Sequence, residues 1–150
     1  MQRMSGFTVS ALALAAVLWS GAVGAVDYRS VSEGAALYDG PSAKAKALYV
    51  ILRGTPVEVV VNQDGWTKVR DYQGDMGWIE RKFLSERRTV IVSAPRAEVR
   101  EKPDTTSPVV FEAGRDVLLD LLDANPPGWL KVRHRDGQTG FIRVTQVWGR

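Results

Sequence analysis

The sequence predicts an all-β protein built from two similar units, and three observations carry this prediction. The stretch GWTKVRDYQGDMGWI at residues 65–79 returns as GWLKVRHRDGQTGFI at residues 128–142, at a constant offset of 63 residues (129 − 66). Short β-rich runs are separated by Asp-Gly and Gln-Gly turns, as in a small sandwich or barrel. No convincing amphipathic helix follows Ala25. An internal repeat of this kind sets the organisation before any single residue is interpreted.

The strands are predicted in the same order in both units. They are residues 47–52, 56–61, 66–70 and 76–79 in the first unit and 89–92, 116–122, 129–135 and 139–144 in the second. Upstream of the repeated hairpin, Pro41 matches Pro103 and Gly54 matches Gly114. Each unit of about 60 residues is therefore expected to hold an extended, looped first strand and then a meander of four short strands.

Alternation along residues 66–70 predicts which side chains face the core. Successive side chains of a strand point to opposite faces, so Val69 and Thr67 should point inward. Trp66, Lys68 and Arg70 should then share the outer face.

The partner strand of the hairpin is predicted to turn Ile79 inward and Trp78 outward. If Val69 and Ile79 are to share the inner face, the connection needs an odd length or a bulge. Gly77 is the predicted place for such a bulge.

The first 25 residues are predicted to be a cleaved signal peptide. Arg3 precedes an apolar run at residues 7–19, and Val23 and Ala25 fit the small-residue pattern of a cleavage site. The run is too short for a stable membrane span, although an uncleaved anchor is the alternative. Two domains are predicted after it, at residues 26–86 and 87–150, in a periplasmic or secreted protein with no membrane span after cleavage.

Composition narrows the classes of function. The chain has no Cys, which excludes a lipoprotein anchor, disulfides and thiolate chemistry. Residues 27–86 carry 8 basic and 9 acidic side chains, whereas residues 87–150 carry 11 and 8. This weak basic bias suits an anionic envelope polymer or ordinary solubility. It is far below the Lys/Arg density of a nucleic-acid binder.

Residues 53–92 (RGTPVEVVV through TVIV) resemble bacterial Src-homology-3-like domains of exported proteins. That family shows a Gly-Thr-Pro-Val strand, a Gly-Trp-x-x-Val strand, a Gly-x-x-Gly-Trp-Ile hairpin and a one-turn helix in this order. The resemblance covers both units and implies two tandem SH3-like, five-stranded, partly open barrels. It also implies a non-catalytic protein, since such domains often help to bind peptidoglycan or to place a partner at the cell wall. A fold alone does not identify the ligand.

The first unit also contains ALYDG at residues 36–40, which is similar to the ALYDY stretch of eukaryotic SH3 domains. Those domains hold Pro-rich peptides in an aromatic groove. The matching implies groove positions for Tyr38, Trp66 and Phe83. In the second unit Arg100 and Gln146 replace the first and last of these, which leaves only Trp129.

The candidate ligand-binding residues follow from these two arguments. A ring flanked by cations suits a sugar or peptide that bears carboxylates, although Trp66 could instead cover the barrel edge. Asp39 could receive a ligand cation or close a turn before Gly40, and Tyr72 at the hairpin tip is either a contact or a turn residue. The full candidate set is Tyr38, Asp39, Trp66, Lys68, Arg70, Tyr72, Trp78, Phe83 and Trp129.

Catalysis finds little support in the sequence. His134 is the only His, so a multi-His metal site is excluded and no His-based triad is expected. The carboxylates are scattered, and no Gly-rich phosphate loop opens a helix. We therefore expect no catalytic residue, no metal and no cofactor.

Two hypotheses remain. The first is a module that binds a cell-wall peptide, a glycan or an anionic envelope polymer through the first unit. The second is an adaptor that docks another envelope protein without affinity for the wall. Wall binding through Lys68 and Arg70 should weaken with salt, whereas apolar docking should largely survive it.

Overall fold

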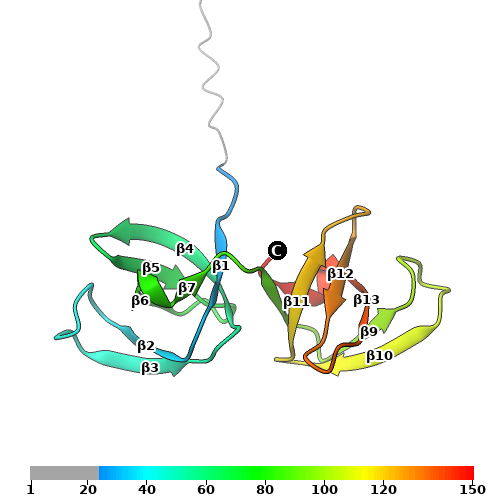
Figure 1. Cartoon of the computed structure of the whole chain (residues 1–150), viewed down its shortest axis with the longest axis horizontal. Coiled ribbons are helices and arrows are strands. Elements are labelled where there is room, and N and C mark those ends of the chain that lie inside the picture. Colours follow the sequence, from blue (N-terminus) through cyan, green and yellow to red (C-terminus); the bar gives the residue numbers. More distant parts are fainter. Residues whose placement is uncertain (1–23) are drawn as a thin grey trace, which may run out of the picture.

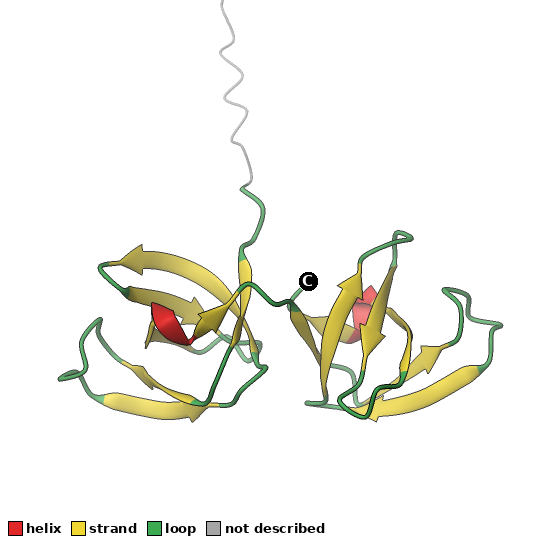
Figure 2. Ribbon diagram, in the orientation of Figure 1, coloured by secondary structure: helices red, strands yellow, loops and turns green. Residues whose placement is uncertain are grey.

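The computed structural model describes residues 24–150, which fold into two similar β domains (Figure 1). Residues 1–23 lie outside the described part, and with them nearly all of the predicted signal peptide. Each domain is built on one antiparallel sheet of seven strands (Figure 2). No helix in the described part is long and apolar enough to cross a membrane.

The first sheet has the strand order β3-β2-β6-β5-β4-β1-β7. A single 3-10 turn, η1 (Arg81–Phe83), precedes its last strand. The strands are β1 (Tyr28–Val31), β2 (Ala35–Tyr38), β3 (Ala47–Ile51), β4 (Pro56–Gln63), β5 (Trp66–Arg70), β6 (Met76–Glu80) and β7 (Leu84–Ser85).

The second sheet repeats this topology with the order β10-β9-β13-β12-β11-β8-β14. A second 3-10 turn, η2 (Val144–Gln146), lies where η1 lies in the first domain. The strands are β8 (Thr89–Val92), β9 (Arg96–Arg100), β10 (Val109–Gly114), β11 (Leu118–Asp123), β12 (Trp129–Arg133), β13 (Thr139–Arg143) and β14 (Val147–Trp148). The all-β class and the tandem arrangement are confirmed, and so are the one-turn helices that the resemblance implied.

Each sheet holds seven strands where five were expected. The single looped first strand of the prediction is in fact two strands, because the turn before Gly34 separates β1 from β2. The two-residue strand β7 then pairs with β1, at Ser30↔Ser85 and Val31↔Leu84. Among the described residues neither sheet closes into a complete barrel, since β3 and β7 end the first sheet and β10 and β14 end the second.

The bulge predicted at Gly77 is absent, and that prediction is wrong. The β5–β6 pair is regular from Trp66↔Glu80 to Arg70↔Met76, with Val69 opposite Gly77. The bulge lies instead in β4, between Val59 and Val61. Gly77 is required for packing, because a Cβ there would lie 3.0 Å from the Cβ of Leu37 on β2. The missing side chain leaves room for β2 to lie beside β6, its neighbour in the sheet.

The predicted inner faces are correct. Val69, Thr67 and Ile79 are fully buried. The core of the first domain consists of Val31, Ala35, Leu37, Ile51, Val57, Val69 and Ile79, with Phe83 and Leu84 packed against it. The larger core of the second consists of Val90, Val92, Ala97, Val99, Ala113, Leu119, Leu130, Val132, Ile142 and Val147. Each domain thus buries its own apolar side chains, which is the main source of its stability.

The two domains also contact each other directly. The Thr89 hydroxyl donates a hydrogen bond of 2.7 Å to the carbonyl of Gly54. The Tyr28 and Trp148 rings meet edge to face at a centroid distance of 5.1 Å. Trp148 on β14 therefore joins the end of the second domain to the start of the first. We call residues 86–88, between β7 and β8, the connector. The guanidinium of Arg88 in the connector lies 5.6 Å from the centre of the Tyr28 ring.

Candidate functional site

Three aromatic side chains gather on the outer surface of the first domain. Tyr38 ends β2, Trp66 begins β5 and Trp78 lies in the middle of β6. The Tyr38 and Trp66 rings meet edge to face, with a centroid distance of 5.5 Å and an interplanar angle of 88°. Tyr38 also lies opposite Trp78 in the β2–β6 pair. All three side chains are half-buried, so part of each ring remains accessible.

Lys68 adds a positive charge to this surface. It lies opposite Trp78 in the β5–β6 pair and two residues after Trp66, so all three share one face. Lys68 forms no ion pair with any described residue. We call Tyr38, Trp66, Lys68 and Trp78 the aromatic face. It offers ring surface for stacking and one ammonium group for an anion.

Arg70 has the orientation expected for the outer face, but it already has a partner. Its guanidinium lies 3.6 Å from the Glu58 carboxylate on the neighbouring strand. At the other end of β5, Glu80 lies opposite Trp66 and pairs with Lys82 at 3.1 Å. Among these charges, Lys68 is the one best placed to meet a ligand.

Asp39 has a structural role in its loop. Its carboxylate accepts a hydrogen bond of 3.0 Å from the backbone N–H of Lys46, and its own N–H donates to the Lys46 carbonyl at 3.0 Å. These two bonds close the loop between β2 and β3. The carboxylate therefore supports the loop beside Tyr38.

Tyr72 and Phe83 form none of the contacts that join Tyr38 to Trp66. The Tyr72 hydroxyl, at the β5–β6 hairpin tip, donates a hydrogen bond to the Asp116 carboxylate of the second domain. This bond raises the pKa of Tyr72 above its ordinary value. Phe83 packs against the core of the first domain, with the Lys82 ammonium 4.9 Å from its ring centre.

Trp129 has different surroundings from Trp66. The guanidinium of Arg143 lies 5.5 Å from the centre of its ring. Arg100, which replaces Tyr38, lies opposite Phe141 as Tyr38 lies opposite Trp78. Arg100 donates to the Ser107 carbonyl and to Glu98. No aromatic pair like that of Tyr38 and Trp66 is found among the described residues of the second domain.

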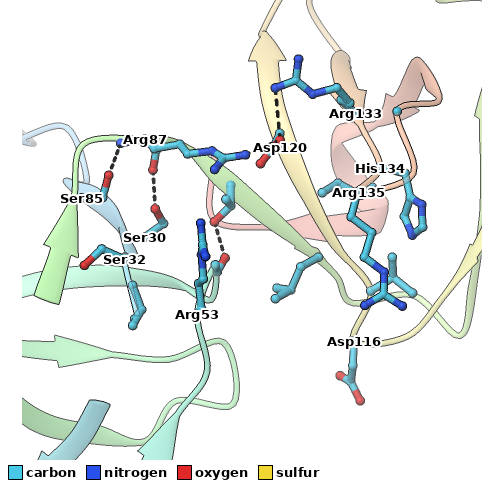
Figure 3. Close-up of a pocket in the computed structure, with 17 residues that line it drawn as sticks. Ser30, Ser32, Arg53, Ser85, Arg87, Asp116, Asp120, Arg133, His134 and Arg135 are labelled. Atoms are coloured by element: carbon cyan, nitrogen blue, oxygen red, sulfur yellow. Dashed lines mark hydrogen bonds and ion pairs between the residues drawn. The ribbon is translucent and has the colours of Figure 1, made fainter. Parts of the chain in front are cut away.

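The sequence analysis missed a second feature, a cleft of about 920 Å³ lined by both domains (Figure 3). We call it the interdomain cleft. Its walls carry Arg53, Arg87, Arg133 and Arg135, together with Asp116 and Asp120. The only available signal was the density of basic residues in RKFLSERR and in RHR. Nothing in those two stretches indicates that their arginines would line the same cleft as Arg53.

The comparisons with known proteins agree with the fold. A family model for the bacterial SH3 domain matches residues 31–86 and again residues 93–149. No curated protein matches the sequence significantly.

Most of the chain resembles part of each of three solved structures. NlpC2 from Trichomonas vaginalis is 16% identical with a TM-score of 0.38, and the match covers 83% of this chain and 48% of that protein. NlpC1 from the same organism is 18% identical with a TM-score of 0.40, and the match covers 87% of this chain and 48% of that protein. An NlpC/P60 family protein from Bacillus cereus is 17% identical with a TM-score of 0.38, and the match covers 81% of this chain and 56% of that protein. The chain thus spans about half the length of each of these proteins.

Proposed function

The chain belongs to the bacterial SH3 domain family, and we propose that it is a non-catalytic binding protein of the cell envelope. Its ligand is cell-wall peptidoglycan or an anionic envelope polymer, held by the aromatic face of the first domain. The signal-peptide pattern in residues 1–25 supports export to the periplasm or beyond.

The edge-to-face pair of Tyr38 and Trp66 is the observation that carries this proposal. Residues 38 and 66 lie far apart in the sequence, yet the fold brings their rings into contact and leaves them partly exposed. A rigid aromatic pair loses little conformational entropy on binding, and its two rings, held at right angles, give an angled aromatic surface against which a sugar ring or a peptide can pack. Lys68, beside Trp78, supplies a cation for a carboxylate of the ligand.

A test compares the chain from residue 26 onward with its Trp66→Ala variant by sedimentation with purified insoluble peptidoglycan. Because an aromatic anchor often dominates a binding surface, the variant should be retained roughly tenfold less. Trp129→Ala is the matched control, since it removes the same ring from a domain without the aromatic pair, and it should be retained like the wild type. High salt should weaken retention through Lys68. No retention of the wild-type chain would overturn the proposal.

A second candidate function is an adaptor for another envelope protein, and one observation favours it. The edge strand β3 exposes Leu48 (43%), Val50 (65%) and, just after it, Leu52 (68%). An uncovered edge with apolar side chains can pair with a strand of another protein. Replacing Val50 by Lys should abolish such docking and leave the sedimentation with peptidoglycan unchanged.

A further inference from the structure

The interdomain cleft has an excess of positive charge. Four arginines line it, Arg53, Arg87, Arg133 and Arg135, against two acids, Asp116 and Asp120, so that its formal charge is +2 (4 − 2). Walls of low dielectric constant focus such a field into the space between them. The cleft therefore attracts anions more strongly than the modest charge of the whole chain indicates.

Part of this charge is already neutralised within the cleft. Asp120 on β11 receives Arg87 of the connector at 2.5 Å and Arg133 of β12 at 3.3 Å. Its side chain is only 19% exposed. Asp116 accepts the hydrogen bond from Tyr72. Both acids thus have structural partners, and two of the four arginines are paired.

Arg53 and Arg135 are the other two arginines. Both are exposed, and neither has an ion pair or a side-chain hydrogen bond within residues 24–150. Arg53 follows β3 in the first domain, whereas Arg135 follows β12 in the second. Figure 3 shows Arg53 on the side of the first domain and Arg135 on the side of the second, and both line the cleft. Each domain thus contributes one available guanidinium group to the same space.

The rest of the lining is mixed, because Val31, Val117, Leu118 and Leu119 lie beside polar residues. Ser30, Ser32 and Ser85 add hydroxyl groups on the side of the first domain. The Ser30 hydroxyl donates to the Arg87 carbonyl at 2.6 Å, and the Ser85 hydroxyl accepts from the Arg87 N–H at 3.1 Å. These bonds fix the connector at the wall of the cleft. A cavity of about 920 Å³ lies within the size range of small-ligand sites.

We propose that the interdomain cleft is a second binding site, for a ligand with two oxyanion groups, with Arg53 holding one group and Arg135 the other. The planar guanidinium fork matches the two oxygens of a phosphate or a carboxylate, and charge-assisted pairs of this kind are strong. A ligand with two such groups neutralises both arginines and bridges the domains. This site is separate from the aromatic face and does not depend on wall binding.

The test is calorimetric titration of the purified protein at low salt, with inorganic pyrophosphate in one series and glutarate in another. Pyrophosphate supplies two phosphate groups and glutarate two carboxylates, so the pair separates the two chemistries. We expect one site per chain for at least one of the two anions. Binding of only one of them would identify the preferred group.

Two double variants complete the test. Arg53→Gln with Arg135→Gln should weaken binding roughly tenfold or more, because both charge-assisted pairs are lost. Lys44→Gln with Lys46→Gln removes the same charge from an exposed loop outside the cleft, and it should leave the affinity within about twofold, as expected for screened surface charges. Thermal unfolding of each variant checks that it is folded.

Two results would overturn the proposal. One is the absence of binding heat for both anions with the wild-type protein. The other is an equal loss of affinity in both double variants, since that outcome would indicate a general electrostatic attraction instead of a site. Neither result bears on the sedimentation experiment, which tests the aromatic face.

Discussion

Trp66 and Trp129 begin the same strand of the two domains, yet their rings meet different neighbours. Trp66 and Tyr38 meet edge to face, and Glu80 lies opposite Trp66 in the sheet. Trp129 lies opposite Arg143, whose guanidinium stacks against its ring. The repeat therefore preserves the position of the tryptophan in the fold but changes what its ring can offer. In the first domain the ring is part of an aromatic pair, and in the second it is covered by a cation of its own chain.

The same contrast recurs near the hairpin. In the first domain the Tyr49 hydroxyl donates a hydrogen bond of 2.8 Å to Asp71. In the second domain Phe111 and His134 occupy the corresponding places, and their rings lie 5.7 Å apart. A polar contact between β3 and the residue after β5 has been replaced by a ring contact between β10 and the residue after β12. Surface pairs have thus diverged while the strands that carry them have not.

The cores differ at a buried position of the repeated hairpin. Thr67 is fully buried in the first domain and donates its hydroxyl to the Asn62 side chain at 2.9 Å. Leu130 takes the corresponding place in the second domain and belongs to its apolar core. The second domain therefore has the more apolar core, and the first domain has the more distinctive surface. The first domain is also the one that carries the binding surface we propose.

The largest expected effect concerns the glycine that each hairpin needs for packing. A Cβ at Gly140 would lie 2.6 Å from Val99 Cγ1 and 2.7 Å from the Arg100 carbonyl oxygen, whereas one at Gly77 would lie no closer than 3.0 Å to Leu37. Gly140→Ala should therefore cost about 3 kcal/mol of unfolding free energy and Gly77→Ala about 1 kcal/mol, as overpacking does. Urea unfolding followed by tryptophan fluorescence measures both. Equal costs would show that the two hairpins are packed alike.

An intermediate effect is expected when the residue beside the tryptophan is exchanged. Tyr38→Arg gives the first domain the side chain found at that position in the second, and it should lower retention on peptidoglycan roughly fivefold through loss of the aromatic pair. Arg100→Tyr, the reverse exchange, should give no gain, because Arg143 still covers Trp129. Sedimentation of both variants measures this. A gain with Arg100→Tyr would show that the position alone determines binding.

The smallest effect concerns pH. Burial, together with the hydrogen bond to Asp71, raises the pKa of Tyr49 in the folded protein. The neutral hydroxyl is thus favoured by folding, so its contribution is present below the unfolded tyrosine pKa of about 10 and is lost as the pH rises above it. Tyr49→Phe should reduce the loss of unfolding free energy at alkaline pH by about 0.5 kcal/mol. The effect is small because the site is partly exposed. Urea unfolding measures this difference between about pH 8 and about pH 11, a range that brackets the tyrosine pKa. Phe111→Leu is the control for the second domain.

Much of the fold was predictable because strand signals are local. The period of two along residues 66–70 placed Thr67 and Val69 inside, and both are fully buried. The repeat then carried the same assignment to the second domain. The predicted outward orientation of Trp66, Lys68 and Trp78 was also correct, because cross-strand neighbours on a regular hairpin share a face.

The errors came where two strands distant in sequence approach each other. Gly77 was interpreted as a bulge, although its role is to let β2 pass close to the hairpin. The split of the first strand into β1 and β2 appears in the pairing of β1 with β4 and β7, while β2 pairs with β3 and β6. Neither contact leaves a periodic signal in the sequence.

The sequence by itself determined that the protein has two β units of one design, and it determined which residues of the repeated hairpin face inward. Alternation and turn chemistry act between near neighbours, so they can be read along the chain. Only the tertiary structure decided that Tyr38 would touch Trp66, and that Arg53 and Arg135 would line one cleft. Such contacts depend on how whole sheets cross and how two domains pack, and no local pattern of residues specifies that geometry.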